Sequence, residues 1–189
     1  MIPAFEAIKA INDLRDEEIV IGTMTPNRYW ELITDRPDLD LPVFGAMGKA
    51  SSIALGLALA RPDKKFIVLD GDGALLMNLG SLVTISGKNP DNLIHFVFDD
   101  GAYVTTGGQP VPGGGRHDFV SIAKGAGIEQ SHSFEDLEAL VNDLPHLLAL
   151  NGPVFVAIKV FHEAGVPGMY IGSTKDAALR LMKTLDNSE

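Results

Sequence analysis

The sequence predicts an α/β fold, with one open, mostly parallel sheet and helices on both of its faces. Two apolar runs, Phe66–Leu69 and Ile94–Phe98, have the length and the branched or aromatic content of buried strands. Runs of strand character alternate along the chain with runs of helical periodicity, which is typical of parallel sheets. Because no repeat or linker interrupts this alternation, we expect residues 1–189 to form a single domain.

The composition limits the classes of protein to consider. An apolar fraction of 46% in 189 residues is ample for a hydrophobic core, and the net charge of −10 disfavours nucleic acid as a partner. The absence of cysteine excludes disulfides and thiolate chemistry and fits a reducing cytoplasm. The N-terminus lacks a signal-peptide layout, and the uncharged run Gly73–Gly87 is too short to span a bilayer. We therefore expect a cytoplasmic protein with no membrane partner.

The first part of the chain carries helical and strand patterns in turn. Apolar residues three or four apart indicate helices, a threonine before a proline is a preferred helix start, and a polar, proline-broken stretch favours a loop. The expected elements are a helix over Pro3–Asp16, a strand over Glu18–Gly22, a helix capped by Thr25 and starting at Pro26, a loop over Asp35–Leu41, and a helix over Ala46–Ala60.

The second part continues the alternation around a long glycine-rich loop. Such a loop inside a compact domain is usually functional. Ser133–Asp136 resembles a capping box, and the leucines after it form one apolar stripe. The expected elements are a helix over Leu75–Ser86, a loop over Gly101–His117, a helix capped by Asp118 and ending at Lys124, a helix after Asp136 that reaches Leu148, a strand over Pro153–Val160, and a helix over Thr174–Leu185.

Acidic residues and glycines follow both of the buried strands. Asp70–Gly73 follows the first strand and Asp99–Gly101 follows the second. In an open parallel sheet, ligands bind beyond the carboxyl ends of the strands, so we expect Asp72 and Asp100 to lie over one site. Two carboxylates beside glycine backbone suit a divalent cation that holds a phosphate-bearing ligand.

These motifs resemble those of thiamine diphosphate-dependent decarboxylases. The segments GAMGKASSIALGLALA, GDGALLMNLGSLVTI and DDGAYVTTGGQP look most like the β subunit of sulfopyruvate decarboxylase and the C-terminal domain of phosphonopyruvate decarboxylase. The resemblance implies a thiamine diphosphate-binding fold of the diphosphate-binding type, with thiamine diphosphate and Mg2+ as cofactors. It also implies the loss of CO2 from a small 2-keto acid, with the cofactor accepting the electrons that are released.

The same resemblance implies a set of metal ligands. They are the side chains of Asp72 and Asp100 and the backbone carbonyl of Ala102. The family normally has asparagine where this chain has Asp100. Because aspartate adds a negative charge beside a diphosphate, we expect it to strengthen metal binding and to weaken cofactor binding.

Further residues are assigned to the cofactor by the resemblance. The carbonyl of Gly45 would accept a hydrogen bond from the aminopyrimidine, and Met47 would wedge under the cofactor and bend it. Thr23 and Thr25 would lie near the diphosphate. At the turn after the first buried strand, the glycines would expose N–H groups and the helix would direct its positive end to the diphosphate. The residues concerned are Gly71, Gly73 and Ala74.

The loop after Asp100 is expected to approach the reaction centre and the substrate. Tyr103, Val104, Thr105 and Thr106 would lead from the metal to the reaction centre. Three later loop residues are candidates for binding the substrate's carboxylate, sulfonate or phosphonate, and the arginine is the strongest because of its forked donors. They are Gln109, Arg116 and His117.

One catalytic group of the family has no counterpart in this sequence. In the family, a glutamate on a separate pyrimidine-binding domain ionises the cofactor. We therefore expect this chain alone to bind the cofactor poorly and to be inactive, with the catalytic glutamate supplied by a partner α subunit in a hetero-oligomer. The active site would lie at the interface between the two chains.

The sequence leaves two other interpretations open. Asp70–Gly73 also matches the motif of haloacid-dehalogenase-type phosphatases, in which Asp70 would attack phosphorus and Asp72 would act as the acid, although Ala74 is atypical there. A non-catalytic cofactor-binding subunit is the other, and the aspartate at position 100 lends it support. The sequence does not distinguish sulfopyruvate, phosphonopyruvate and plain 2-keto acids as substrates.

Overall fold

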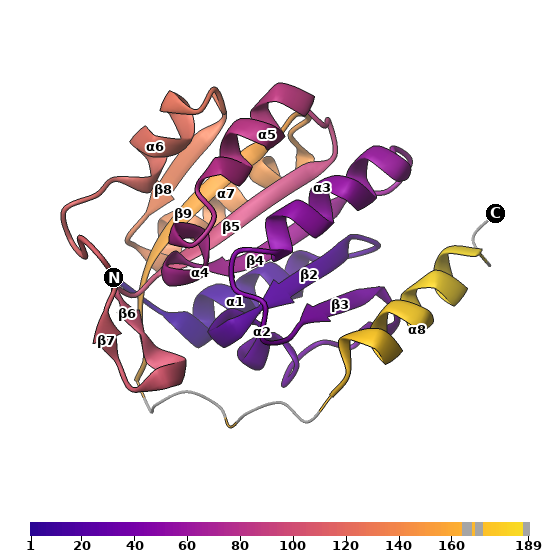
Figure 1. Ribbon diagram of the computed structural model, residues 1–189, viewed down its shortest axis with the longest axis horizontal. Coiled ribbons are helices and arrows are strands. Elements are labelled where there is room, and N and C mark those ends of the chain that lie inside the picture. The colour runs from indigo at the N-terminus through magenta and orange to yellow at the C-terminus, as the bar shows by residue number, and fades with distance from the viewer. Residues whose placement is uncertain (164–167, 169–171, 187–189) are drawn as a thin grey trace.

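The computed structural model, which describes residues 1–163, 168 and 172–186, is organised around one parallel sheet (Figure 1). Its strands run in the order β1-β9-β5-β4-β2-β3, and β8 also pairs with β9. Every strand pair in this sheet is parallel. The strands are β1 (Ile2–Pro3), β2 (Ile19–Thr23), β3 (Asp40–Val43), β4 (Phe66–Gly71), β5 (Leu93–Asp99), β8 (Ser131–Phe134) and β9 (Val154–Phe161).

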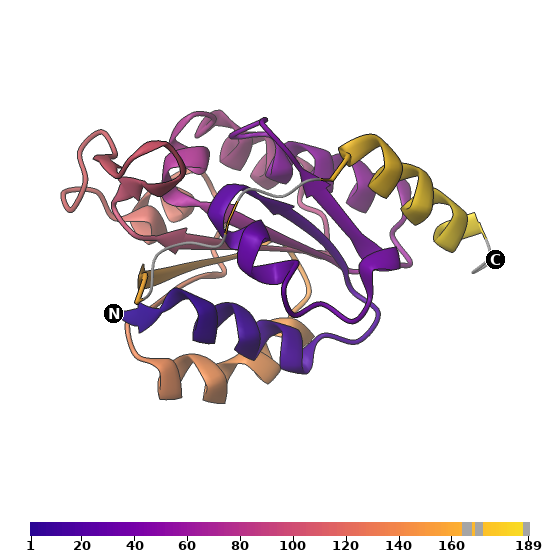
Figure 2. The ribbon, with the colours of Figure 1, turned by 90° about the horizontal axis from the view of Figure 1, so that it is seen from below.

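Helices cover both faces of the sheet, which confirms the predicted α/β architecture (Figure 2). One apolar core joins the sheet to α3, α5, α6 and α8, and a second core joins its other face to α1, α2 and α7. The helices are α1 (Ala4–Leu14), α2 (Met24–Trp30), α3 (Ala50–Ala60), α4 (Asp72–Leu76), α5 (Gly80–Lys88), α6 (Phe119–Gly125), α7 (Leu137–Ala149) and α8 (Thr174–Asp186).

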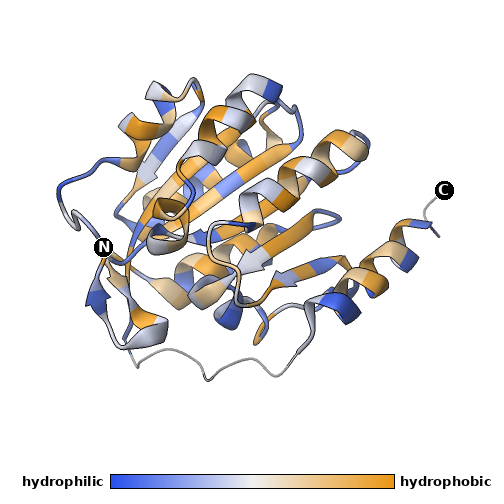
Figure 3. Cartoon of the chain, viewed as in Figure 1, coloured by the Kyte–Doolittle hydropathy of each residue, from blue (hydrophilic) through white to orange (hydrophobic). Residues whose placement is uncertain are grey.

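The central strands are apolar on both sides because both sides are covered. Ile19 and Ile21 of β2 point into the first core, whereas Val20 between them points into the second. The central strands are therefore mostly orange in Figure 3, with one hydrophilic band across β5. None of the helices within the described part of the chain is long and apolar enough to cross a membrane.

The strand order places a crevice between β2 and β4. From β2 the chain moves outward to β3, and it then returns to the other side of β2 to form β4 and β5. Where the direction reverses, the connections after neighbouring strands leave on opposite faces, and a crevice opens beyond their carboxyl ends. The starts of α2 and α4 border this crevice.

Three strands of the sheet, β1, β3 and β8, were not predicted. The expected loop Asp35–Leu41 instead holds a 3-10 turn, η1 (Pro37–Leu39), and the start of edge strand β3. Asp40 interrupts the apolar pattern by which a buried strand is recognised. It is buried because its carboxylate accepts hydrogen bonds from Arg15 at 2.9 Å and Thr34 at 2.7 Å. Ser133 belongs to β8 rather than to a capping box, and Asp136 caps α7 through the N–H of Ala139 at 3.0 Å.

Helix boundaries also differ from the expectations at three places. The helix expected over Ala46–Ala60 begins at Ala50, because Gly45 and Gly48 adopt positive φ angles of 65° and 72°. The helix expected over Leu75–Ser86 is divided into α4 and α5. Thr25 lies inside α2, which begins at Met24, and makes no capping hydrogen bond. The Asp118 cap of α6 is confirmed, with the N–H of Val120 at 2.9 Å.

The glycine-rich loop is more ordered than expected. It contains a small antiparallel hairpin, formed by β6 (Ala102–Tyr103) and β7 (Gln109–Pro110), with a 3-10 turn, η2 (Val104–Thr106), between them. The hairpin folds the first half of the loop back beside the carboxyl end of β5 (Figure 1).

At the end of α2, Glu31 is partly buried and accepts a hydrogen bond from Nδ2 of Asn27 at 2.9 Å. Burial raises the pKa of Glu31 to about 7, and the charge of Asp40 acts in the same direction. Because the folded state holds this proton more tightly than the unfolded chain, Glu31 makes the free energy of unfolding fall as the pH rises from about 4.5 to about 7.

We predict that Glu31→Gln removes this contribution, because the amide keeps an acceptor for Asn27 but does not ionise. Urea unfolding should show a variant about 1–2 kcal/mol more stable than the wild type at pH 8 and of nearly equal stability at pH 4. An equal difference between the two proteins at both pH values would contradict the prediction.

Candidate functional site

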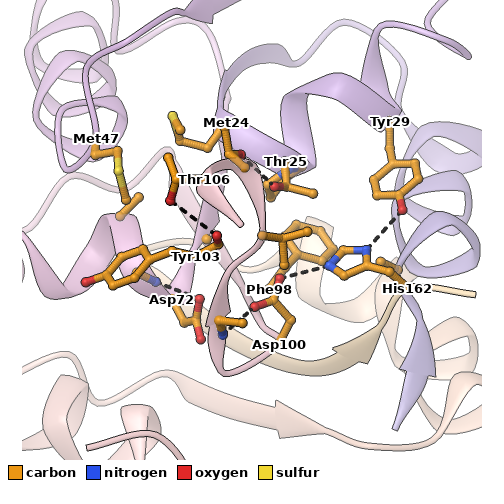
Figure 4. Close-up of a pocket in the computed structure, with 18 of the residues that line it drawn as sticks. Met24, Thr25, Tyr29, Met47, Asp72, Phe98, Asp100, Tyr103, Thr106 and His162 are labelled. Carbon is orange, nitrogen blue, oxygen red and sulfur yellow. Dashed lines mark hydrogen bonds and ion pairs between the residues drawn. The ribbon is translucent and has the colours of Figure 1, made fainter. Parts of the chain in front are cut away.

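A pocket of about 520 Å³, including its open mouth, lies beyond the carboxyl ends of β2, β4 and β5 (Figure 4). Its walls come from α1, the start of α2, the turn after β4, the β6–η2 segment and the end of β9. The lining residues are Ala4, Ile8, Met24, Thr25, Pro26, Tyr29, Met47, Gly71, Asp72, Gly73, Ala74, Phe98, Asp100, Ala102, Tyr103, Val104, Thr105, Thr106 and His162.

Asp72 joins the two acidic turns. It is the first residue of α4 and is 2% exposed. Its Oδ1 accepts a hydrogen bond from the N–H of Gly73 at 2.6 Å, and its Oδ2 accepts one from the N–H of Gly101 at 2.8 Å. The second bond ties the turn after β4 to the turn after β5, so the predicted convergence of Asp72 and Asp100 on one site is observed.

Asp100 is held from two sides. Its Oδ1 accepts a hydrogen bond from the N–H of Ala102 at 2.8 Å, and its Oδ2 lies 2.9 Å from Nε2 of His162. On the other side of the ring, Nδ1 of His162 lies 3.0 Å from the hydroxyl of Tyr29. The three side chains form one hydrogen-bonded row along the wall of the pocket (Figure 4).

The electrostatics of the pocket favour a cation. Burial raises the pKa of Asp72 well above its ordinary value, and the negative charge of Asp100 raises it further, although hydrogen bonds from Gly73 and Gly101 oppose the change. A cation bound between the two carboxylates would relieve this repulsion. Among the described residues there is no cluster of three or more acidic or histidine side chains placed to hold a metal. The remaining ligands of such a cation would therefore be a backbone carbonyl, such as that of Ala102, and oxygens of a bound ligand.

The glycines of the turn act differently from the expectation. The N–H of Gly71 donates to Oδ1 of Asp70 at 3.0 Å, and the N–H of Gly73 donates to Asp72. Both N–H groups that were expected to face a diphosphate thus stabilise the turn itself. Gly73 is required by close packing instead, since a Cβ atom there would lie 2.5 Å from the ring of Tyr103.

Met47 stands over the pocket on a segment that glycine makes possible (Figure 4). The next residue, Gly48, has a φ of 72°, and a Cβ atom on it would lie 2.9 Å from Cβ of Asn78. Asn78 sits in the break between α4 and α5 and donates to the carbonyl of Gly48 at 2.8 Å. The divided helix therefore anchors the segment that carries Met47.

The loop after Asp100 closes the pocket against α2. The hydroxyls of Thr25 and Thr105 are 3.3 Å apart, and Thr106 lines the same wall. Met24, beside Thr25, has a φ of 52°, a left-handed conformation that is costly for a residue other than glycine. Such strain is commonly found at binding sites.

Several predicted site residues lie elsewhere. Thr23 is fully buried and donates to the carbonyl of Val43 at 3.1 Å, so its hydroxyl ties β2 to β3. Gly45 is exposed and is not among the described residues that line the pocket. The three loop residues proposed for the substrate are also outside its lining: Gln109 and Arg116 are exposed, and His117 packs its ring on Phe119.

Asp70 does not have the environment of a phosphatase nucleophile. Its side chain is fully buried, accepts the N–H of Gly71 and lies 3.3 Å from Nε2 of His95 in the sheet. Because an attacking carboxylate must reach its substrate, this position argues against the haloacid-dehalogenase interpretation.

Seven lining residues were not anticipated from the sequence; they are Ala4, Ile8, Met24, Pro26, Tyr29, Phe98 and His162. His162 comes directly after the carboxyl end of β9, and the rule that selected Asp72 and Asp100 would also have selected it. Tyr29 lies one helical turn after Thr25 on α2. Met24 and Phe98 carry no chemical signal in a sequence, because apolar residues beside a strand are usually core.

Comparison with known proteins identifies the family. The model of the thiamine pyrophosphate enzyme C-terminal TPP-binding domain matches residues 21–158. The chain belongs to this family. The match contains both acidic turns, most of β2 and β9, and every element between these two strands. It confirms the resemblance found in the sequence and the expectation of an enzyme of the thiamine diphosphate class.

Two curated relatives are similar over most of this chain. The sulfopyruvate decarboxylase subunit beta of Methanothermobacter thermautotrophicus is 38% identical over 85% of this chain and 83% of its own length. The phosphonopyruvate decarboxylase of Streptomyces viridochromogenes is 36% identical over 77% of this chain, but over only 36% of its own length.

Solved structures support the fold. The benzoylformate decarboxylase of Polynucleobacter necessarius superposes with a TM-score of 0.70 over 87% of this chain and 34% of that chain, at 19% identity. At this identity the likeness concerns the fold alone.

The contact between Gly73 and Tyr103 gives a direct test of the packing at the turn. We predict that Gly73→Ala displaces the Tyr103 ring and lowers the free energy of unfolding by about 1–3 kcal/mol, since a Cβ atom there overpacks the wall. Urea denaturation measures the change.

The matched control is Gly56→Ala in α3, where a Cβ atom meets nothing within 4 Å. This variant should be about 0.5–1 kcal/mol more stable than the wild type, because alanine is the better helix former. Equal stability changes in the two variants would refute the packing argument.

Proposed function

We propose that this chain is the diphosphate- and Mg2+-binding subunit of a thiamine diphosphate-dependent 2-keto acid decarboxylase. The observation that carries the proposal is the meeting of Asp72 and Asp100 in one pocket, with Ala102 beside them. The family match supplies the cofactor class, and the two curated relatives act, by their names, on sulfopyruvate and phosphonopyruvate.

The residues present fit a magnesium ion that holds a diphosphate. Mg2+ prefers oxygen ligands and commonly takes one or two carboxylates together with phosphate oxygens. Asp72 and Asp100 would supply the carboxylates, and the carbonyl of Ala102 would supply a third protein oxygen. The unfavourable charge that the two carboxylates impose on each other supports the assignment, because a dication offsets it.

Other lining residues would receive the rest of the cofactor. Met47 overhangs the pocket and would support the bend between the cofactor's two rings, with the carbonyl of Gly45 at the aminopyrimidine. Gly71, Gly73 and Ala74 would lie along the diphosphate. Because the Thr23 hydroxyl is hydrogen-bonded to Val43 of β3 and Thr25 faces the pocket, Thr25 is the better hydroxyl for the diphosphate.

When bound, thiamine diphosphate supplies the electron sink that a 2-keto acid needs to lose CO2. The contribution of this chain is to bind, to orient and to exclude water. Ile8, Phe98 and Met24 give the pocket apolar walls, which lower the local polarity around a reacting carboxylate. Thr105 and Thr106 add two hydroxyls to the wall where the loop after Asp100 meets α2, and these hydroxyls would face the reaction centre.

A second chain is part of the proposal. The relative from Methanothermobacter thermautotrophicus is named as a subunit beta, and the phosphonopyruvate decarboxylase of Streptomyces viridochromogenes is much longer than the part that this chain matches. We infer that a pyrimidine-binding α subunit supplies the catalytic glutamate and that the pocket is completed at the interface between the subunits.

The substrate proposed is a 2-keto acid with a second anionic group, such as sulfopyruvate or phosphonopyruvate. Its anionic group would be met by Gln109, Arg116 or His117 on the β6–β7 loop and the segment after it. Since these residues lie outside the pocket lining, they would serve only if the partner or the substrate draws the segment inward.

Calorimetric titration of thiamine diphosphate into the full chain at millimolar concentrations tests the site. We predict weak binding that requires Mg2+ and disappears with EDTA. Asp72→Asn should weaken it by more than about 100-fold, because loss of an outer-sphere partner alone costs 10- to 100-fold. Asp38→Asn, a charge-matched change at the distant turn η1, should leave it unchanged. Binding that needs no Mg2+ would contradict the assignment.

Reconstitution with a pyrimidine-binding chain separates the enzyme from a non-catalytic cofactor-binding subunit. Each chain alone should be inactive, and the mixture should release CO2 from sulfopyruvate or phosphonopyruvate. Cofactor binding by the mixture without turnover of any 2-keto acid would favour the non-catalytic subunit. Phosphatase turnover by this chain that is lost in Asp70→Asn would instead favour the phosphatase interpretation.

A further inference from the structure

His162 connects an acidic site residue to a helix on the far wall of the pocket. It follows β9 directly, and its ring lies between Asp100 and Tyr29, at 2.9 Å from the carboxylate and 3.0 Å from the hydroxyl. The side chains of His162 and Asp100 are only 13% and 12% exposed. The ring of His162 also stacks on that of Tyr29, with 5.8 Å between centroids and 8° between planes.

The direction of the hydrogen bond to Asp100 is fixed by chemistry. An ionised carboxylate can only accept hydrogen bonds. The hydrogen therefore lies on Nε2 of His162, which donates a hydrogen bond to Oδ2 of Asp100. The hydroxyl of Tyr29 donates to Nδ1 when the ring is neutral and accepts from it when the ring is charged. In both states the bond to Asp100 has the same polarity, and the arrangement therefore does not depend on titration of the ring.

The Asp100 carboxylate is left with little freedom. One oxygen is held by the N–H of Ala102 at 2.8 Å and the other by His162. Each carboxylate oxygen has a second lone pair, so both remain available to a cation while the plane of the group is fixed. These two donors come from the start of β6 and from the residue after β9, and His162 is held in turn by Tyr29 near the end of α2.

A carboxylate held in this way loses less conformational entropy when it binds a metal. A free side chain loses rotational freedom when it becomes a ligand, whereas a side chain oriented in advance has already lost it. Hydrogen-bond partners behind metal ligands have this effect in many sites, and their loss typically weakens metal binding by 10- to 100-fold. The N–H of His162 also donates a hydrogen bond to Asp100 and so stabilises the negative charge of this second carboxylate in the pocket.

We propose that His162, itself held by Tyr29, is a positioning residue that fixes the Asp100 carboxylate and thereby sets the affinity of this site for its divalent cation. The proposal rests on the proposed function, because Asp100 is there a metal ligand. A purely structural tie between β9 and α2 is the competing explanation. It would change the stability of the fold without a specific effect on the metal.

The test measures Mn2+ binding to the full chain in the presence of thiamine diphosphate, using the electron paramagnetic resonance signal of free Mn2+. His162→Phe keeps an aromatic ring beside Tyr29 but loses both hydrogen bonds, and we expect Mn2+ affinity to fall by about 10- to 100-fold. His162→Gln keeps an N–H donor for Asp100 and should restore the affinity to within about threefold of the wild type. Tyr29→Phe keeps its ring and should lose about three- to tenfold.

Lys159→Met is the matched control. Lys159 pairs with Asp99, the last residue of β5 and the one directly before Asp100, and that pair lines a different cleft. The variant breaks a carboxylate–cation pair at the same edge of the sheet without touching Asp100. Its Mn2+ affinity should remain within about threefold of the wild type, and metal-free thermal unfolding of every variant shows whether affinity merely follows stability.

The outcomes distinguish the proposed function from the positioning role of His162. No Mn2+ binding by the wild type would contradict the proposed function itself. Wild-type binding with an unchanged affinity in His162→Phe would overturn the positioning role alone, as would a loss of affinity in His162→Gln as large as that in His162→Phe. If His162→Phe fails to fold, Tyr29→Phe decides, and a wild-type affinity there overturns the proposal.

Discussion

The parallel register of β4 and β5 brings two carboxylates together at one edge of the sheet. Gly71 lies opposite Phe98 in this register, so the residues that follow them leave the sheet side by side. The N–H of Gly101 then bonds to Asp72 and ties the two turns into one unit. Two negative groups in a buried pocket are unfavourable unless something offsets them, and a divalent cation is the simplest such partner. The pocket, the cofactor class and the role of the loop after Asp100 all depend on this convergence.

The rest of the site supports that edge. The reversal of strand order between β2 and β4 opens the crevice, and α2 crosses it with Thr25 and Tyr29. The break between α4 and α5 holds the segment of Met47 through Asn78. The two apolar cores pack on both faces of the strands and so fix the positions from which the turns leave the sheet.

The residues that the sequence predicted correctly are those governed by a general rule. Asp72 and Asp100 follow buried strands, and the ends of parallel strands meet, so their proximity follows from local patterns alone. Edge strand β3 was missed because Asp40 is a buried charge whose partner, Arg15, is far away in the sequence. The N–H groups of Gly71 and Gly73 were expected to be free, since a sequence does not reveal that the neighbouring carboxylates use them. His162 directly follows a strand and was open to the same rule, whereas its contact with Tyr29 depends on the distance between β9 and α2, which is a tertiary property.

The most direct test of the account is a crystal structure of the full chain with Mn2+ and thiamine diphosphate, with anomalous scattering used to locate the metal. We predict one anomalous peak between the carboxylates of Asp72 and Asp100, within coordination distance of both and of the Ala102 carbonyl. A metal bound elsewhere, or a diphosphate held in the pocket with no metal between these two side chains, would contradict it.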